Sequence, residues 1–375
     1  MRILVYIIYW AFLVEVAFFP KSIYSDEILF HERSNNKMNM YSIKPDGSDL
    51  KSLGPGRYPQ RSPDKNYLSY IKFIPHHYII SLWGQGSLVI KDLKRNVSFQ
   101  VEDHLQGERF PIEHIICYCW SPDSKSVAFA TLFGPGKGDG YICVFDLRTQ
   151  KTRKVVQFRR DGVKNENIFI STRLEWSPDG KYLVFSSPVK ILNDNKSIKL
   201  INPNNGKIKI IAKNSSFSSF INNKSILFVT GYEGVEGAEI WTMHIDGSEK
   251  MKIFNLKLPI ILTSKAVNNK VIFQTSETKN GQPILQFLDI KEKYLITIKV
   301  EDYILLCPNI SPDGNKMTVF GMNNKLGKGN IGFYIFDFET NNISLLKDLQ
   351  YDELSEDKGF WFGALYGYGN STNWN

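Results

Sequence analysis

A short phrase recurs four times along the chain and constrains its fold more than any other feature of the sequence. The phrase is Ser-Pro-Asp. Arg precedes it in the copy at 61–64, Trp precedes it in the copies at 120–123 and 176–180, and a fourth copy lies at 311–314. Each copy is followed within a few residues by a lysine and then by a short apolar run that ends in an aromatic residue. Pro presets the backbone of a turn and Asp bonds to its own main chain, so each copy predicts a strand, a turn and a second strand. Recurrence at this spacing is typical of a propeller or a solenoid.

Aligned on the aromatic residue that ends each second strand, the repeat extends to seven copies. These strand ends are Ile28–Phe30, Leu68–Tyr70, Val127–Phe129, Leu183–Phe185, Ile226–Phe228, Val271–Phe273 and Thr318–Phe320. Two copies replace the Pro-Asp turn by the Asn-Asn-Lys of 222–224 and 268–270, and Asn supports the same turn. A third and a fourth strand follow each aromatic, most clearly around Asp46-Gly47 and Asp246-Gly247, which are strong hairpin signals. We therefore predict an all-β propeller of four-stranded blades, with seven blades favoured and six as the alternative.

The first of these units lacks its opening strand. The segment Asn370–Asn375 ends at the position that Cys119-Trp120-Ser121 occupy in the third unit, so it can supply the missing strand. A C-terminal strand that completes the N-terminal blade would close the ring and leave only short outer edges.

The first residues are typical of a secretory signal peptide. Arg2 precedes the apolar stretch Ile3–Phe19, which is interrupted only by Glu15, and a small residue, Ser25, comes before Asp26. We expect a signal peptide over 1–25 and a single β-propeller domain over 26–375, located in the periplasm or secreted. An uncleaved membrane anchor is the alternative. No later segment is long and apolar enough to span a bilayer.

The formal charge of +8 is spread along the chain. Its densest basic spots are Lys151–Lys154 and Arg159-Arg160, which we interpret as a solvated loop. No aromatic and basic motif of a known nucleic-acid reader is present, so no nucleic-acid partner is expected. The sequence makes no prediction of oligomeric state.

The four cysteines are predicted to be buried free thiols. Cys117 and Cys119 are two residues apart on one expected strand, where they share a face and lie too far apart to bridge comfortably. Cys143 is two strands further along the same blade, and Cys307 belongs to a distant one.

These repeats resemble the TolB-like β-propeller family, a WD40-like repeat whose units read strand, Trp-Ser-Pro-Asp-Gly, Lys, a strand that ends in Phe, a third strand and Asp-Gly-Ser. The segments Ile43–Ser48 and Met243–Ser248 match its third turn closely, and the resemblance spans about residues 27–350. It implies a propeller fold and an envelope location. TolB itself carries an α/β domain ahead of its propeller; here the repeats begin directly after the expected signal peptide, so we expect that domain to be absent.

The same repeat is similar to the propellers of the prolyl-oligopeptidase and dipeptidyl-peptidase families, which gate an α/β-hydrolase domain. Such a domain needs a Gly-x-Ser-x-Gly elbow. This pattern does not occur in the chain, and only Tyr351–Asn375 follows the last repeat. We therefore expect no hydrolase domain.

No residue is predicted to be catalytic, cofactor-binding or metal-binding. Gly327–Gly332 matches a dinucleotide-binding string, but a strand and not a helix is expected to follow it, which favours an ordinary loop. His76-His77 is interpreted as a loop pair. The other histidines, at 31, 104, 114 and 244, are scattered over several blades. The Asp residues of the Pro-Asp turns have a sufficient structural role, and Trp120, Trp176 and Trp374 are expected to pack at blade junctions.

The expected functional surface follows from loop length. The long insertions 73–86, 133–140, 188–196, 230–238 and 323–332, with the connectors 102–114 and 157–171, all emerge on one face of a propeller. We therefore expect a non-enzymatic scaffold that binds a protein or a cell-envelope component through this loop-rich face. The alternative is a carbohydrate-active or hydrolytic propeller with a site at the mouth of the central channel.

Export gives the first testable prediction. If residues 1–25 are a signal peptide, the mature protein begins close to Asp26 and is recovered in a soluble fraction. Mass spectrometry of the purified protein measures its N-terminus directly. An intact Met1 in a membrane fraction would show instead that Ile3–Phe19 is an anchor.

Overall fold

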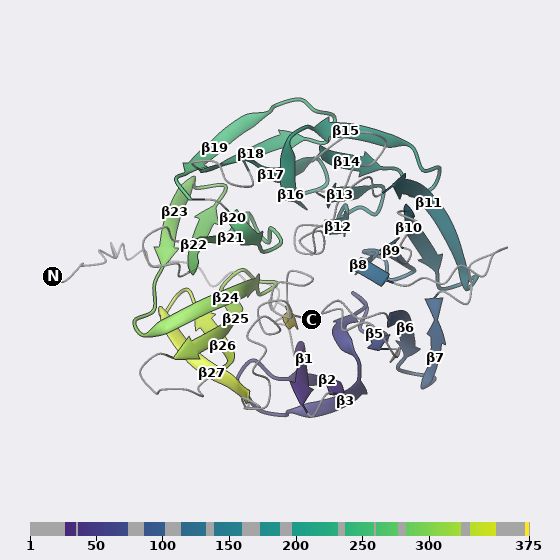
Figure 1. Ribbon diagram of the computed structural model, residues 1–375, viewed down its shortest axis with the longest axis horizontal. Coiled ribbons are helices and arrows are strands. Elements are labelled where there is room, and N and C mark those ends of the chain that lie inside the picture. The colour runs from purple at the N-terminus through teal and green to yellow at the C-terminus, as the bar shows by residue number, and fades with distance from the viewer. Residues whose placement is uncertain are drawn as a thin grey trace, which may run out of the picture.

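The computed structural model describes residues 27–34, 37–73, 86–101, 114–132, 139–159, 173–187, 197–231, 237–258, 260–276, 283–323, 331–349 and 372–374. The named elements in these ranges are all β-strands, and they form seven four-stranded sheets. The sheets stand around a central axis like the blades of a propeller (Figure 1). The predicted all-β propeller is confirmed, with seven blades.

The strands of each blade follow one another from the channel outward. Blade 1 holds β28 (Thr372–Trp374), β1 (Ile28–Ser34), β2 (Lys37–Ile43) and β3 (Lys51–Pro55), and blade 2 holds β4 (Arg57–Arg61), β5 (Tyr67–Phe73), β6 (Gly86–Asp92) and β7 (Val97–Gln100). Blade 3 holds β8 (His114–Trp120), β9 (Ser126–Leu132), β10 (Asp139–Asp146) and β11 (Lys151–Arg159), and blade 4 holds β12 (Arg173–Trp176), β13 (Leu183–Ser187), β14 (Ser197–Ile201) and β15 (Ile208–Ala212). Blade 5 holds β16 (Ser215–Phe220), β17 (Ser225–Thr230), β18 (Ala238–His244) and β19 (Met251–Leu256). Blade 6 holds β20 (Ile260–Thr263), β21 (Lys270–Ser276), β22 (Pro283–Asp289) and β23 (Tyr294–Ile298), and blade 7 holds β24 (Tyr303–Ile310), β25 (Lys316–Asn323), β26 (Ile331–Asp337) and β27 (Asn342–Leu349).

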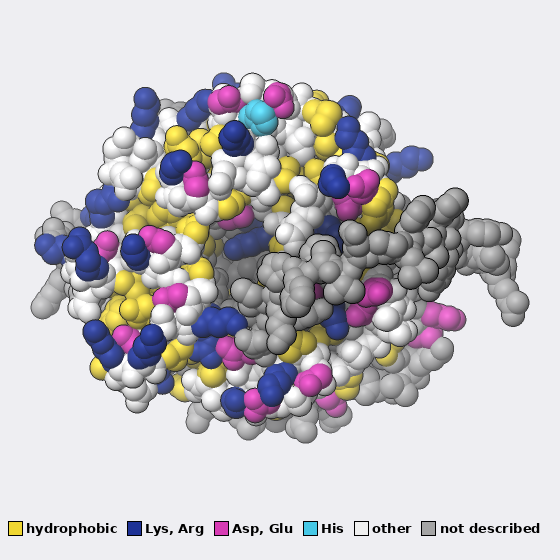
Figure 2. All heavy atoms as spheres, turned by 180° about the vertical axis from the view of Figure 1, so that it is seen from behind, with side chains coloured by type: hydrophobic (Ala, Val, Ile, Leu, Met, Phe, Trp, Pro, Cys, Tyr) yellow, Lys and Arg dark blue, Asp and Glu magenta, His cyan; other side chains and the backbone are white. Residues whose placement is uncertain are grey.

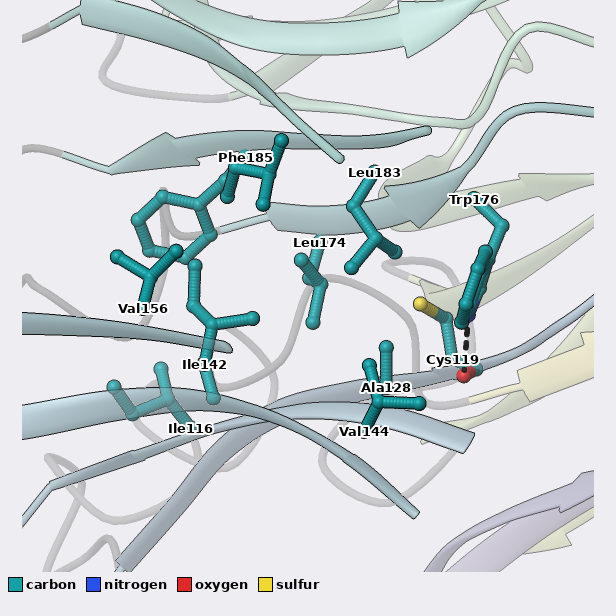
Figure 3. Close-up of a cluster of buried hydrophobic side chains, with 12 residues drawn as sticks. Ile116, Cys119, Ala128, Ile142, Val144, Val156, Leu174, Trp176, Leu183 and Phe185 are labelled. Atoms are coloured by element: carbon teal, nitrogen blue, oxygen red, sulfur yellow. Dashed lines mark hydrogen bonds between the residues drawn. The ribbon is translucent and has the colours of Figure 1, made fainter. Parts of the chain in front are cut away.

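The repeated aromatic residues form the core between the blades. The phenylalanines that end the repeated second-strand motif are almost fully buried, at positions 30, 129, 185, 228, 273 and 320. Between blades 3 and 4, Phe185 packs with Ile142 and Leu174, and the indole N–H of Trp176 donates to the Cys119 carbonyl at 3.3 Å (Figure 3). The apolar face of each blade is thus covered by the next blade. The predicted packing of Trp120 and Trp176 at blade junctions is confirmed.

The recurring Ser-Pro-Asp phrase is explained by one set of hydrogen bonds. In blade 3 the Ser121 hydroxyl donates to Asp123 at 2.7 Å and accepts the Ser126 N–H at 2.9 Å, while the same Asp123 oxygen accepts the Lys125 N–H. The equivalent Ser–Asp pairs occur at 62 and 64, 177 and 179, and 311 and 313. Each pair ties the inner strand of a blade to its neighbour, so the turn residues have the structural role that the sequence predicts.

A strand from the C-terminal end completes the first blade, as predicted. β28 pairs antiparallel with β1, with Ile28 opposite Trp374 and Phe30 opposite Thr372. β28 also contacts β24 and β4, the inner strands of the blades on either side. An ion pair between Arg61 and Glu27, 2.6 Å from Nε to Oε1, adds a link between the start of the chain and blade 2. The ring is therefore closed by main-chain pairing between distant parts of the sequence.

All four cysteines are free, as the sequence predicts, and three of them are fully buried. Burial raises the pKa of the Cys119 and Cys143 thiols to about 12, so these thiols stay protonated at neutral pH.

Two interpretations of the basic region of blade 3 are wrong. Lys151–Lys154 do not lie in a loop: they begin β11, which continues to Arg159. The connector that was expected from Gln157 therefore starts after Arg159. A run of Lys, Thr, Arg and Val on a solvent-facing edge strand has no alternating apolar pattern, which explains why it resembles a loop in sequence.

The expected signal peptide over 1–25 lies outside the described residues, so its cleavage stays a prediction. Within the described ranges, no helix is long and apolar enough to cross a membrane.

The closure predicts the effect of a short deletion. Removing Asn370–Asn375 takes away the pairs between β28 and β1 and exposes the inner edge of blade 1. Each net hydrogen bond contributes about 0.5–1.5 kcal/mol to stability, so we expect the melting temperature to fall by about 5 °C or more. Thermal unfolding followed by circular dichroism measures this. A deletion variant that melts within a degree or two of the full chain would mean that the ring does not depend on β28.

Candidate functional site

The loop-rich face that the sequence predicts as the binding surface lies mostly outside the described residues. This holds for 74–85, 102–113, 133–138, 160–172, 188–196, 232–236 and 324–330, and with them for His76, His77, His104 and the first four residues, 327–330, of the glycine-rich string. The described residues form the scaffold from which these segments leave. Two of its features can bind a ligand on this side of the molecule: the inner wall of the channel and a groove between blades 1 and 2.

Polar and charged side chains gather on the inner strands of blades 4 to 6. Arg173 and Glu175 lie two residues apart on β12, and both are half-buried. The guanidinium of Arg173 reaches past blade 5 and donates to the Ser264 carbonyl of blade 6 at 3.2 Å, and on its way it lies 5.9 Å from the centre of the Phe217 ring. Figure 2 shows Lys and Arg side chains at several points around the hollow in the middle of one face. The wall of the channel is therefore charged and lined from several blades.

Glu175 is the acidic member of this group. Burial raises the pKa of its carboxyl, while Lys265, a hydrogen bond from Ser219 and Arg173 act in the opposite direction. Burial also lowers the pKa of Arg173, to about 10, against the attraction of Glu175. The guanidinium stays charged at neutral pH, and the carboxylate is stabilised by two cations. Carboxyl groups with a perturbed pKa that face a channel are candidates for function, although structural ion pairs shift pKa values in the same way.

The described histidines do not form a metal site. His31 lies on β1 and is buried, its Nδ1 accepts the Tyr58 N–H at 3.3 Å, and burial together with Arg57 lowers the pKa of its ring to about 3. His244 lies on β18 and faces Glu249, 3.2 Å from Nε2 to Oε2. In the part of the chain that the structure describes, no three His, Cys, Asp or Glu side chains come together as metal ligands.

A groove of about 610 Å³ opens between blades 1 and 2. Its lining is mixed, with about as much polar as apolar surface. Leu53 and Pro55 of β3 lie on one side and Tyr70, Val89 and Phe99 of blade 2 on the other, and polar groups come from Lys72, Ser98 and Gln100. The ends of β5 and β7 that line it are those from which the long segments 74–85 and 102–113 leave blade 2.

Glycine at position 56 permits this arrangement. It adopts φ of 151°, and a Cβ there would lie 2.7 Å from the Tyr70 ring and 2.8 Å from the Met40 side chain. Because Gly56 has no side chain, the backbone can pass from β3 to β4 with the Tyr70 ring packed against it. The Tyr70 side chain in turn lines the groove. The repeat alignment equates Tyr70 with the buried phenylalanines of the other blades, so a polar-tipped aromatic at that position is a sequence signal that marks this blade as different.

Comparisons with known proteins support the fold. No protein-family model and no curated protein matches the chain. Among solved structures it is similar to an oligogalacturonate lyase from Vibrio parahaemolyticus, with a TM-score of 0.62 and 12% identity over 84% of this chain and 88% of that one. It is similar to the β-propeller domain of the Trilobed protease from Pyrococcus furiosus, with a TM-score of 0.61 and 13% identity over 86% of this chain and 92% of that one. TolB from Acinetobacter baumannii matches with a TM-score of 0.46 and 18% identity over 74% of this chain, which spans 64% of that TolB. At such identities the likenesses to the lyase and to the Trilobed protease domain are evidence for a β-propeller and for nothing finer.

The raised pKa of Glu175 predicts how stability depends on pH. A raised pKa means that the folded protein holds this proton more tightly than the unfolded chain, so ionisation of Glu175 opposes folding increasingly as the pH rises from the ordinary glutamate range. Glu175→Gln cannot ionise. We expect the stability of the variant relative to the wild type to increase as the pH rises above about 4.

Urea unfolding at several pH values measures this difference, with Glu301→Gln as the same change at an exposed position. If the wild type instead becomes more stable relative to Glu175→Gln as the pH rises, the attraction of the carboxylate to Arg173 and Lys265 outweighs the cost of burial.

Proposed function

We propose that this chain is an exported, non-enzymatic propeller that binds a protein or a component of the cell envelope through its loop-rich face. The observation that carries the proposal is the groove between blades 1 and 2. Its lining combines aromatic and aliphatic side chains with polar groups in about equal surface, and interfaces with other macromolecules have such a mixed composition. Location in the periplasm or outside the cell rests on the expected signal peptide.

The position of the groove supports the same proposal. β3, β5 and β7 present its lining residues near the ends that face the long loops. A partner seated in the groove would therefore also meet the segments that leave blade 2. Rigid strands supply the apolar anchor, and the loops supply variable contacts, which is how binding surfaces are commonly built on β scaffolds.

One observation favours the alternative, a carbohydrate-active or hydrolytic propeller with its site at the mouth of the channel. Glu175 is a half-buried carboxyl with a raised pKa beside two cations on inner strands. An acid catalyst requires a carboxyl of this kind. The two functions depend on different residues, since the binding groove needs Leu53 and a channel site would need Glu175.

Leu53→Asp tests the binding proposal. Leu53 is half-buried on the outer strand β3, so the change places a charge in the groove and leaves the core intact. We expect the purified wild type to retain a specific component of an envelope extract and the variant to lose it, with an apparent affinity at least about ten-fold weaker. Leu345→Asp is the matched control, because Leu345 is an exposed leucine on β27, the outer strand of blade 7.

Loss of the component with both variants would reflect non-specific hydrophobic capture and would contradict the proposal. Retention by both would exclude the groove. An activity of the wild type on a sugar or ester substrate that disappears in Glu175→Gln and persists in Leu53→Asp would establish the alternative instead.

A further inference from the structure

The outer strand of blade 6, β23 (Tyr294–Ile298), lies at the edge of its sheet, and in the described part of the chain it pairs with β22 alone. Figure 1 shows it at the outer rim of the ring. An edge strand carries a row of backbone N–H and C=O groups with which a strand of another chain can pair. Folded proteins protect such edges with charged residues, with proline, with bulges, or by keeping the strand very short. The seven outer strands of this ring differ in that protection.

Six of the seven outer strands are protected. In five blades a bulge shifts the pairing between the third and the fourth strand, at Met40/Tyr41, Ile142/Cys143, Ile198/Lys199, Ile240/Trp241 and Phe333/Tyr334. A bulge bends the strand and increases its twist, which makes the edge a poor template for another strand. The outer strands of these five blades, β3, β11, β15, β19 and β27, also carry at least one charged residue each. β7 has no bulge, but it is only four residues long.

β23 has none of these features. Its sequence, Tyr-Leu-Ile-Thr-Ile, contains no charged residue and no proline, and its pairing with β22 runs without a shift from Tyr294 to Ile298. Aromatic and β-branched residues of this kind favour strand pairing. Tyr294 is 43% exposed and Ile296 is 49% exposed, and Thr297 is exposed as well. Among the described outer strands of five or more residues, β23 is therefore the one that presents a straight, uncharged and partly apolar edge.

We propose that β23 pairs antiparallel with β23 of a second copy of this chain, so that two propellers join edge to edge about a two-fold axis. In such a pair both copies use the same strand, and each residue of one copy faces the residue at the mirrored position of the other. Each copy has one edge of this kind among its described strands, and a symmetric pair occupies both edges. The association therefore closes at a dimer and does not continue into a fibre.

The charges at the ends of β23 determine the register. A two-fold axis at Ile296 would place Lys293 opposite Lys299 of the second copy, twice, and like charges in that position oppose pairing. An axis at Thr297 brings Lys293 next to Glu301 of the second copy instead, again twice. Opposite charges stabilise a cross-strand pair.

No like charges face each other along 294–300 when the axis lies at Thr297. The next acidic pair would be Glu292 and Asp302, but both residues belong to turns, where the chain leaves the line of the strand. The ends of the strand are thus complementary in charge to the ends of a second copy.

The side chains of the strand are also complementary to themselves in this register. Tyr294 lies beside Val300 of the second copy, Ile296 lies beside Ile298, and the two Thr297 side chains face each other. Aromatic with β-branched pairs and Thr with Thr pairs are among the favourable cross-strand combinations. Pairing covers the exposed Tyr294 and Ile296 side chains of both copies, which removes apolar surface from water. This self-complementarity favours a second copy as the occupant of the edge.

The contact involves a short stretch of each copy, so it is smaller than a standard protein interface and should be reversible. We expect a dissociation constant on the order of 10 μM. The inference goes beyond the proposed function and does not rest on it, because β23 lies in blade 6 and the groove lies between blades 1 and 2. Leu53→Asp should therefore dimerise as the wild type does, and a failure of either proposal leaves the other intact.

Sedimentation velocity of the purified protein, from about 1 to 200 μM, measures the association. Ile296→Lys gives β23 the charge that the outer strands of five other blades carry, so we expect dimerisation at least about ten-fold weaker. Leu345→Lys is the matched control, because it makes the same change at an exposed leucine of the outer strand β27, and it should dimerise within about two-fold of the wild type. A wild type that stays monomeric at about 200 μM would overturn the proposal, whether the edge then takes a strand of another protein or none. Equal dimerisation by the wild type and Ile296→Lys would also overturn it, and so would a series of species larger than a dimer.

A cysteine on the two-fold axis tests the register and does not depend on how well Ile296→Lys folds. Residues directly opposite each other in an antiparallel pair have Cα atoms about 4.5–5.5 Å apart, and a disulfide accepts about 4.4–6.8 Å. Thr297→Cys should therefore form a disulfide-linked dimer under mild oxidation, seen on a non-reducing gel. Leu345→Cys and the wild type, whose four cysteines are free, are the controls and should remain monomers on the same gel. Cross-linking of Thr297→Cys that is no faster than that of Leu345→Cys would overturn the symmetric pairing of β23.

Discussion

The structure depends on closing a ring of sheets whose apolar faces cover one another. Each buried cluster takes its side chains from two neighbouring blades, as Leu174 and Phe185 of blade 4 do with Ile142 of blade 3. A single blade would leave both of its faces exposed, so no blade can be stable alone. The pairing of β28 with β1 joins the last part of the chain to the first, and the cluster around Phe30 lies at this junction with blade 7. Closure is thus a condition for the whole core.

Such a ring leaves grooves where adjacent blades do not fill the space between them. At the blade 1 and 2 junction, Tyr70 is half-buried where the equivalent phenylalanines are buried, and a groove with a mixed apolar and polar lining remains. At the blade 3 and 4 junction a second groove, of about 950 Å³, lies where Gly206 and Arg153 hold the outer strands together while the turns beside them stay apart. Both grooves are properties of the packing between repeats, and both are as rigid as the strands that form them.

The sequence predicts what is repeated and misses what is not. The Ser-Pro-Asp turns, the buried aromatics and the C-terminal strand all follow from residues that recur at one position of the repeat. The approach of Arg173 to Ser264 does not, because it depends on how far one inner strand reaches past the next blade toward a third. The pattern of Lys151–Lys154 predicts a loop, although these residues begin β11, because the outer strand of a blade needs no apolar alternation. Local pattern therefore determines the scaffold here, whereas the sites arise from contacts between blades.

The same turns that build the fold also place carboxylates on its surface. Each Ser-Pro-Asp turn uses a carboxylate to accept hydrogen bonds from its own serine and backbone, as Asp123 and Asp313 do. Neutral donors do not cancel the charge of a carboxylate, and Asp123 and Asp179 are exposed. The lysine that follows each of them lies close by, with Lys125 Nζ 3.9 Å from Asp123 and Lys181 Nζ 3.2 Å from Asp179. Each of these turns therefore presents an ion pair, and the net charge that a partner meets must come from residues outside the repeated phrase.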